Sequence, residues 1–176
     1  FMVLYIKKGG ELVPRTARRK SETGIYHVII RGVNRQPIFH YPNDYEKFLQ
    51  ILKDRQASDK FQIYAYCLMI NHVHLLFHEG EKSMSCTFQQ INTRYACWYN
   101  KKYNRCGHLF QGRYKSSSVN DDSYFLILLR YIHRNPVKAG LCSKVSDYPW
   151  NSYHEYIDSN TLVNIDYPLS VLAKRK

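Results

Sequence analysis

The chain has 176 residues, of which 44% are hydrophobic and 23% charged, with a formal net charge of +12. This length and composition predict one globular domain with a buried core, and no apolar run approaches the roughly 20 residues that would span a bilayer. Such a positive charge is typical of proteins that bind a polyanion, most often nucleic acid, although a merely basic surface also produces it.

The chain is predicted to divide into a basic extended lead-in over residues 1–23, a main domain over 24–156 and a C-terminal tail over 157–176. The lead-in carries Arg15, Arg18 and Arg19, which are candidates to contact a DNA hairpin stem or a flanking strand. The chain beyond Trp150 is rich in aromatic residues and shows no regular pattern. We expect it to pack across the domain or to extend toward a partner.

Hydrophobic periodicity and turn residues predict the elements of the main domain in chain order. The first half contains a strand over 26–30, a helix from Tyr45 capped by Asn43-Asp44, and strands over 61–69 and 72–77 joined at Ile70-Asn71. The second half contains a helix over 85–100, a strand over 112–119, and a helix capped by Asp121-Asp122-Ser123 that Pro136 and Gly140 end after Asn135. This β-α-β-β-α-β-α order predicts an α+β fold of the split βαβ kind, with an antiparallel sheet and the helices packed on one face.

Two histidines, His72 and His74, lie two residues apart in a predicted strand. Because residues two apart on a strand point to the same face, both imidazoles project together, with Cα atoms roughly 6.5–7 Å apart. Two imidazoles at this separation can bind one metal ion. His78 has the same parity and is an alternative ligand, although Glu79-Gly80 indicates that the strand ends there.

The last predicted helix carries Tyr131 and Asn135 four residues apart, so one lies a turn above the other on the same stripe. A tyrosine beside two histidines and an oxygen ligand provides the groups needed to break a DNA phosphodiester through a covalent phosphotyrosine. In the alternative interpretation, Tyr131 is a packing residue and Asn135 only ends the helix before Pro136.

Positive charge and aromatic rings are concentrated between residues 82 and 120, where seven Lys or Arg residues occur without any Asp or Glu. Positive charge follows a phosphate backbone and flat rings stack on unpaired bases, so this mixture favours single-stranded or hairpin DNA. Some of these polar residues could instead only stabilise a loop. The candidate contacts are Arg105, His108, Gln111, Arg113 and Lys115.

The five cysteines are an odd set without a Cys-x-x-Cys pair. This pattern argues against a disulfide framework and against a zinc knuckle. It favours reduced thiols, and we therefore expect a cytoplasmic location without a membrane partner.

Three separated motifs, which occur in the same order here, resemble those of the single-tyrosine HUH transposases. More specifically, they resemble the REP-associated tyrosine transposases, which are kin to the IS-two-hundred class of insertion-sequence enzymes. Segments at 24–32 and 147–153 agree with this likeness, which extends over about residues 14–156. The motifs are Cys67-Leu68-Met69-Ile70-Asn71-His72-Val73-His74-Leu75-Leu76, Gly107-His108-Leu109-Phe110-Gln111-Gly112-Arg113-Tyr114-Lys115 and Tyr131-Ile132-His133-Arg134-Asn135-Pro136-Val137-Lys138-Ala139-Gly140-Leu141.

The resemblance implies a ferredoxin-like or palm-like fold in which residues 24–156 form an HUH transposase domain. It implies that His72 and His74 bind a divalent ion, Mg²⁺ or Mn²⁺, and that Tyr131 is the nucleophile. The third ligand is expected at Asn135, where insertion-sequence relatives often have glutamine; because asparagine is one methylene shorter, a bridging water is an alternative.

The expected activity is the cleavage and rejoining of single-stranded, hairpin-flanked DNA through a 5′-phosphotyrosine. A protein with the same fold that binds hairpins without cleaving them is the alternative from a different class. A nickase resembling replication initiators shares the chemistry, but the short chain without a helicase segment argues against it. Insertion-sequence relatives act as dimers that exchange catalytic helices, whereas the REP-associated branch could act as a monomer, so a homodimer is a further possibility.

Overall fold

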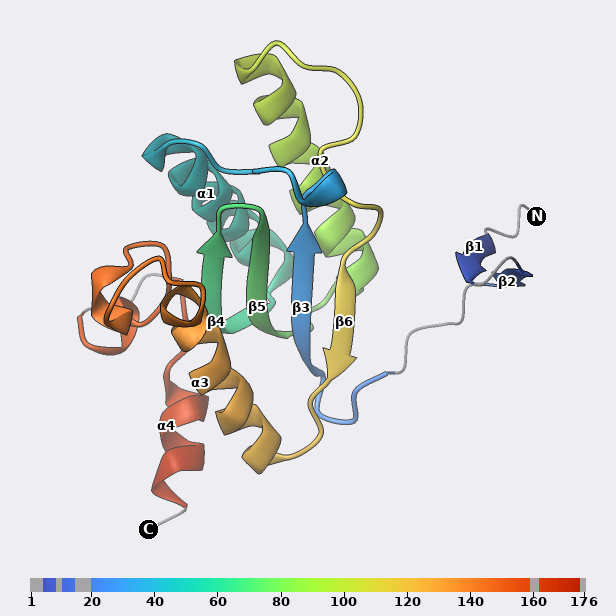
Figure 1. Ribbon diagram of the computed structural model, residues 1–176. Helices are drawn as coiled ribbons and strands as arrows, with labels where there is room; N and C mark the ends of the chain where they lie inside the picture. The colour runs from blue at the N-terminus through green and yellow to red at the C-terminus, as the bar shows by residue number, and fades with distance from the viewer. Residues whose placement is uncertain (1–4, 9–10, 15–19, 159–161, 175–176) are drawn as a thin grey trace.

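The computed structural model describes residues 5–8, 11–14, 20–158 and 162–174. Its centre is a four-stranded antiparallel sheet in the order β4-β5-β3-β6, as Figure 1 shows. The strands are β3 (Ile25–Arg31), β4 (Gln62–Met69), β5 (His72–His78) and β6 (Lys115–Ser118). The predicted α+β class and antiparallel sheet are therefore confirmed.

The helices lie on both faces of this sheet, and not on one face as expected from the sequence (Figure 1). The helices α1 (Pro42–Asp59) and α2 (Met84–Lys102) share one hydrophobic core with Val28, Val73 and Leu75. The helix α3 (Asp122–Lys138) covers the opposite face, where it packs on alternating residues of β4 such as Cys67 and Met69. Both faces of the central strands are apolar, so each face needs a covering layer.

Several predicted boundaries change in the structure. The helix α1 begins at Pro42, because Asp44 lies in the first turn and accepts hydrogen bonds from the amides of His40 and Tyr41 (2.7 and 3.0 Å). The helix α3 continues through Pro136 to Lys138, since the fixed φ of proline is itself helical and only one backbone hydrogen bond is lost.

Shorter elements complete the described chain. They are the hairpin of β1 (Tyr5–Lys8) and β2 (Glu11–Pro14), the 3₁₀ turns η1 (Val33–Arg35), η2 (Val145–Asp147) and η3 (His154–Tyr156), and the helix α4 (Asp166–Ala173). The tail is thus not wholly irregular, since α4 is helical and its Tyr167 ring packs on Phe125 of α3. In the described ranges, no helix combines the length and the apolar character needed to cross a membrane.

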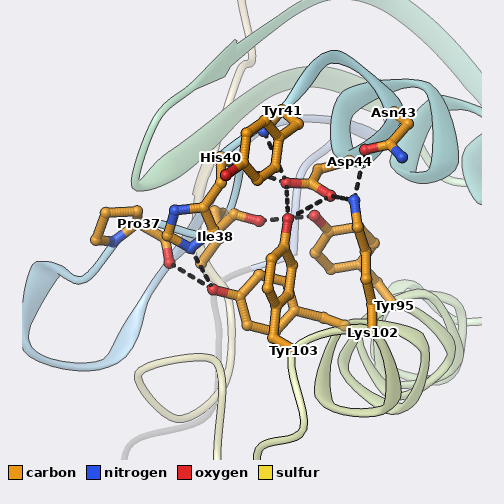
Figure 2. A network of polar contacts seen from close by, with 10 residues as sticks. Pro37, Ile38, His40, Tyr41, Asn43, Asp44, Tyr95, Lys102 and Tyr103 are labelled. Carbon is orange, nitrogen blue, oxygen red and sulfur yellow. Dashed lines mark hydrogen bonds and ion pairs between the residues drawn. The ribbon is translucent and has the colours of Figure 1, made fainter.

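Two buried carboxylates join α1 to α2. At the start of α1, Asp44 accepts hydrogen bonds from Lys102 and from the Tyr103 hydroxyl (2.7 Å), as Figure 2 shows. At the end of α1, Asp59 accepts bonds from Arg55, Lys82 and Thr87. Because both side chains are fully buried, each charge depends on these partners, and together they fix the antiparallel pair of helices at both ends.

Candidate metal and tyrosine site

His72 and His74 lie at the start of β5, on the face of the sheet that α3 covers. The alternation of the strand turns Val73 and Leu75 to the opposite core, as expected. The two imidazole rings are 4.9 Å apart between centres, and their planes are inclined at 81°. This separation allows one nitrogen of each ring to bind the same ion, given metal–imidazole bonds of about 2.0–2.1 Å, the zinc value.

The ring of His72 is oriented by its neighbour in the sequence. Its Nδ1 atom donates a hydrogen bond to Asn71 Oδ1 (2.6 Å), and the Asn71 amide donates in turn to the carbonyl of Arg35 (3.0 Å). This arrangement leaves His72 Nε2 with its lone pair available to a metal ion. Hydrogen bonds of this kind fix the tautomer of metal-binding histidines.

A third histidine, His27 of β3, orients the ring of His74. His27 Nε2 lies 3.0 Å from His74 Nδ1, and the two rings are stacked with centres 5.2 Å apart. A proton on His74 Nδ1, donated to His27, leaves His74 Nε2 available to an ion. The sequence analysis missed this contact, because it depends on the antiparallel register that places Ile29 opposite His74.

All three histidines have lowered pKa values. Burial is the main cause, and it lowers the pKa of His27 and His72 to about 4 and that of His74 to about 3. The charges of His72, His27 and Arg31 lower the pKa of His74 further. The rings are therefore neutral at pH 7, which is the form that binds metal ions.

The helix α3 places Tyr131 against two of these rings, those of His74 and His27. The Tyr131 ring meets His74 edge-on, with 5.6 Å between centres and 90° between planes, and it meets His27 at 6.0 Å. Lys138, two turns further along α3, holds its ammonium 5.1 Å from the centre of the Tyr131 ring. The structure thus brings the predicted tyrosine to His74 of the predicted histidine pair and adds a lysine that the sequence analysis did not single out.

Asn135 lies one turn after Tyr131 and donates its side-chain amide to the Tyr131 carbonyl (2.9 Å). Within the described chain no hydrogen bond joins Asn135 to His72 or His74, so its role as the third ligand stays a prediction. His78 does belong to β5 and points to the same face, yet it lies six residues from His72, roughly 20 Å along the strand. One ion cannot bind both.

The side chains near α3 fit a divalent ion only if the two imidazoles are combined with an oxygen ligand of another kind. Among the described residues, no three His, Cys, Asp or Glu side chains are grouped to hold a metal ion. His27 cannot complete the pair, because its Nε2 atom faces His74. Two neutral imidazoles are suitable ligands, so a carboxamide such as that of Asn135, or a water molecule, has to supply the remaining oxygen.

Comparison with known proteins decides the family. The family model described as "Transposase IS200 like" matches residues 20–135. The chain belongs to the IS200-like transposase family. The matched region contains the three histidines, Tyr131 and Asn135 but ends before Lys138, and the resemblance noted in the sequence is confirmed.

Individual relatives agree with this family. A Haemophilus influenzae protein provisionally described as a REP-associated tyrosine transposase is 29% identical over 127 residues, covering 65% of this chain and 72% of that protein. The REP-associated tyrosine transposase of Escherichia coli (strain K12) is 24% identical over 110 residues, covering 60% of each chain. A solved REP-associated tyrosine transposase bound to a REP hairpin has the same fold, with a TM-score of 0.70 and 20% identity over 88% of this chain and 90% of that one.

The predicted DNA contacts of this IS200-like chain fall in different places. Arg15, Arg18 and Arg19 lie outside the described residues. Arg105 is half-buried and donates to the side chain of Gln36 (3.2 Å), so it holds a loop in place. The remaining four are exposed on or just after the loop between α2 and β6, and they are His108, Gln111, Arg113 and Lys115.

Lys115 is the predicted contact that lies on the same face as the histidines. Its register partner on β3 is Ile29, whose partner on β5 is His74, so the three residues form one row across the sheet. Two strand spacings, roughly 10 Å, separate the Lys115 and His74 backbones. Arg31 is the register partner of His72 and adds a second exposed cation to this face.

Proposed function

We propose that this protein is a metal-dependent, single-tyrosine transposase that cleaves and rejoins single-stranded DNA beside a hairpin. The observation that carries the proposal is the edge-on contact of the Tyr131 ring with His74, 5.6 Å between ring centres. It places a phenol beside two neutral, buried imidazoles, those of His74 and His27. These are the groups that a covalent attack on a phosphodiester requires.

The chemistry proceeds by exchange of one phosphorus–oxygen bond. The Tyr131 hydroxyl attacks the scissile phosphorus and loses its proton to solvent, while the bond from phosphorus to the 3′ oxygen breaks. The departing oxygen takes up a proton and becomes a free 3′-OH, and the 5′ phosphate remains on the tyrosine. Because this ester retains the energy of the broken bond, a 3′-OH from another strand can rejoin the DNA by the reverse attack without ATP.

The residues that would hold the divalent ion are His72 and His74 through their Nε2 atoms, with Asn135 or a water molecule as the oxygen ligand. When bound, Mg²⁺ or Mn²⁺ neutralises charge on a non-bridging oxygen of the scissile phosphate. Since two imidazoles and a carboxamide form a softer set than oxygen ligands alone, Mn²⁺ should bind at least as well as Mg²⁺.

Two features support hairpin-flanked DNA as the substrate. The chain carries a formal net charge of +12, which suits a phosphate backbone. The solved transposase with the same fold is bound to a REP hairpin. Lys115 and Arg31 lie on the same sheet face as Tyr131 and are the cations best placed to hold phosphates beside it.

The test is a denaturing-gel assay with labelled hairpin DNA that carries single-stranded flanks taken from around the gene. We expect a protein–DNA adduct in the presence of Mn²⁺ or Mg²⁺ and none with EDTA, and peptide mapping should locate the phosphate on Tyr131. Tight binding without an adduct, across several hairpins and both metals, would instead indicate a hairpin-binding protein that does not cleave.

The role of His27 gives a prediction about metal affinity. His27→Phe removes the acceptor for His74 Nδ1 while filling a similar volume, so the His74 ring loses its fixed tautomer. We expect Mn²⁺ affinity, measured by isothermal titration calorimetry without DNA, to fall about 10–100-fold. His27→Gln, which keeps an acceptor, should lose less. Equal affinities in all three proteins would show that His27 does not position His74.

Lys138 gives a prediction about rate. Lys138→Met removes the ammonium beside the Tyr131 ring, where it can stabilise the negative charge of the attacking oxygen and the phosphate. We expect adduct formation to slow about tenfold, or about 1.4 kcal/mol in activation free energy, with hairpin affinity within about twofold. Lys53→Met, on α1 across the sheet, is the matched control, and an equal loss of rate there would refute the assignment.

A further inference from the structure

The turn that follows β3 contains two consecutive residues in the left-handed backbone region. Asn34 has a φ of 49° and Arg35 a φ of 58°. Asparagine adopts this region fairly often, but a residue as large as arginine does so rarely and at a cost in free energy. Both side chains are exposed, so the packing of these side chains does not impose the conformation. Backbone strain of this kind persists only where the surrounding structure fixes it.

Hydrogen bonds hold this turn on two sides. Toward the β4–β5 connection, the amide of Gly32 donates to the Asn71 carbonyl (2.9 Å). Toward the loop after α2, the amide of Val33 and the side chain of Gln36 both donate to the Leu109 carbonyl (2.9 and 3.2 Å). A Cβ atom at Gly32 would lie 2.3 Å from the Gln36 carbonyl oxygen, so the turn closes this tightly only with glycine there. These contacts fix the direction of the backbone groups between Gly32 and Gln36.

The carbonyl of Arg35 decides which way the Asn71 carboxamide points. A carbonyl oxygen can only accept, so the NH₂ group of Asn71 faces it (3.0 Å). The Oδ1 atom of Asn71 is thereby turned to His72, whose Nδ1 atom lies 2.6 Å away. Because Oδ1 also can only accept, the neutral His72 ring carries its proton on Nδ1 and keeps the lone pair on Nε2.

The opposite tautomer of His72 becomes available once the Arg35 carbonyl is displaced. The Asn71 carboxamide would then be free to turn over and present its NH₂ group to His72 Nδ1, since the two ends of a carboxamide have nearly the same shape. In that arrangement Nδ1 accepts and the ring proton moves to Nε2. A protonated Nε2 has no lone pair for a metal ion. The tautomer that binds metal therefore depends on the backbone conformation of the turn.

We propose that the left-handed turn at Asn34 and Arg35 sets the tautomer of His72, through the Arg35 carbonyl and the Asn71 carboxamide, and so prepares Nε2 to bind the divalent ion. The inference rests on the proposed function, because the ion is the one that His72 would share with His74. Arg35 is a positioning residue in this role. It acts through its backbone carbonyl and touches neither the ion nor the DNA.

Two substitutions at one position test the turn. Arg35→Gly and Arg35→Val remove the same charged side chain, but glycine adopts a φ of 58° without steric cost, whereas β-branched valine strongly disfavours it. Mn²⁺ affinity of the full chain is measured by isothermal titration calorimetry without DNA, and a thermal melt verifies that each variant is folded. We expect Arg35→Gly to bind within about twofold of the wild type and Arg35→Val about tenfold more weakly. Equal affinities of the two folded variants would overturn the proposal.

A change at Asn71 separates an effect on the tautomer from a general loss of structure. In Asn71→Asp the side chain can only accept, so it keeps the His72 proton on Nδ1 wherever the Arg35 carbonyl points. The added charge is common to both Arg35 variants and cancels in their comparison. In the Asn71→Asp background we therefore expect Arg35→Gly and Arg35→Val to bind Mn²⁺ equally. A tenfold difference that persists there would show that the turn does not act through the carboxamide.

The tautomer itself is read by ¹⁵N NMR of the metal-free wild-type chain, which needs no variant to fold. We expect the His72 ring proton on Nδ1, and a proton on Nε2 would refute the proposal. No DNA enters any of these measurements, so strand cleavage is judged separately by the adduct assay. Normal Mn²⁺ binding by the wild type with equal binding by both Arg35 variants overturns the role of the turn alone. A wild-type chain that binds no Mn²⁺ would overturn the metal site and both proposals.

Discussion

Tyr131→Phe is expected to abolish the covalent protein–DNA adduct while hairpin affinity stays within about twofold. The substitution removes one hydroxyl, which makes no hydrogen bond within the described structure. The ring keeps its edge-on contacts with His74 and His27. Removal of a catalytic nucleophile typically costs a factor of about 10⁴ or more, so the adduct should fall below detection in the denaturing gel.

Tyr124→Phe is the matched control for this experiment. Tyr124 lies on the same helix two turns earlier and is 37% exposed, so its hydroxyl is accessible to solvent but distant from the histidines. We expect normal adduct formation in this variant. An adduct that persists in Tyr131→Phe, or disappears equally in both variants, would place the nucleophile elsewhere.

Asp44→Ala is expected to lower the free energy of unfolding by about 3 kcal/mol, because it leaves Lys102 and the amides of His40 and Tyr41 without their shared acceptor (Figure 2). For a chain of this length the melting temperature should fall by about 6–12 °C. Asp54→Ala, an exposed carboxylate on the same helix, should change stability by no more than about 0.5 kcal/mol. Equal melting temperatures for both variants would show that the Asp44 network is not stabilising.

The same two carboxylates, Asp44 and Asp59, make the free energy of unfolding depend on pH. Burial alone would raise the pKa of Asp44, but bonds from Lys102, Tyr103 and two amides outweigh it, so the pKa is lowered. At Asp59, bonds from Arg55, Lys82 and Thr87 outweigh burial in the same way and lower the pKa to about 2.

A lowered folded-state pKa means that each carboxylate contributes stability above the unfolded value of about 3.9. That contribution is lost as the pH falls toward the folded value, about 2 for Asp59. Denaturant titrations should therefore show the wild-type advantage over Asp44→Ala to be constant from about pH 5 to 7 and to shrink below about pH 4. A difference in free energy of unfolding that instead grows as the pH falls would show that folding raises the pKa of Asp44.

The shared faces of the candidate site residues could be predicted from the sequence, because strand alternation and helix spacing depend only on local geometry. The common face of His72 and His74 follows from alternation, and the alignment of Tyr131 with Asn135 follows from the helical turn. His27 lies 47 residues from its partner. Its place beside His74 depends on the register between β3 and β5, which no local pattern encodes.

Other features depended on tertiary packing. Pro136 looked like a helix terminator, yet it is buried within α3, where packing compensates for the lost hydrogen bond. The hydrogen bond from Asn100 to the Gly107 carbonyl was also not predicted, because it depends on how the loop after α2 folds back on that helix. The placement of α3 on the second face could not be read from element order, since both faces of the sheet are apolar.

Three buried or half-buried tyrosines bear on which phenol reacts in a chain that contains 16 of them. Tyr95, Tyr148 and Tyr156 each donate their hydroxyl to a backbone carbonyl, and burial raises the pKa of all three. A phenol that is held as a donor and disfavoured as a phenolate is a poor nucleophile. Under the proposed function, these three side chains therefore do not compete with Tyr131 for the scissile phosphodiester. A protein rich in tyrosine can in this way bring a reactive DNA end close to many hydroxyls without esterifying its own scaffold.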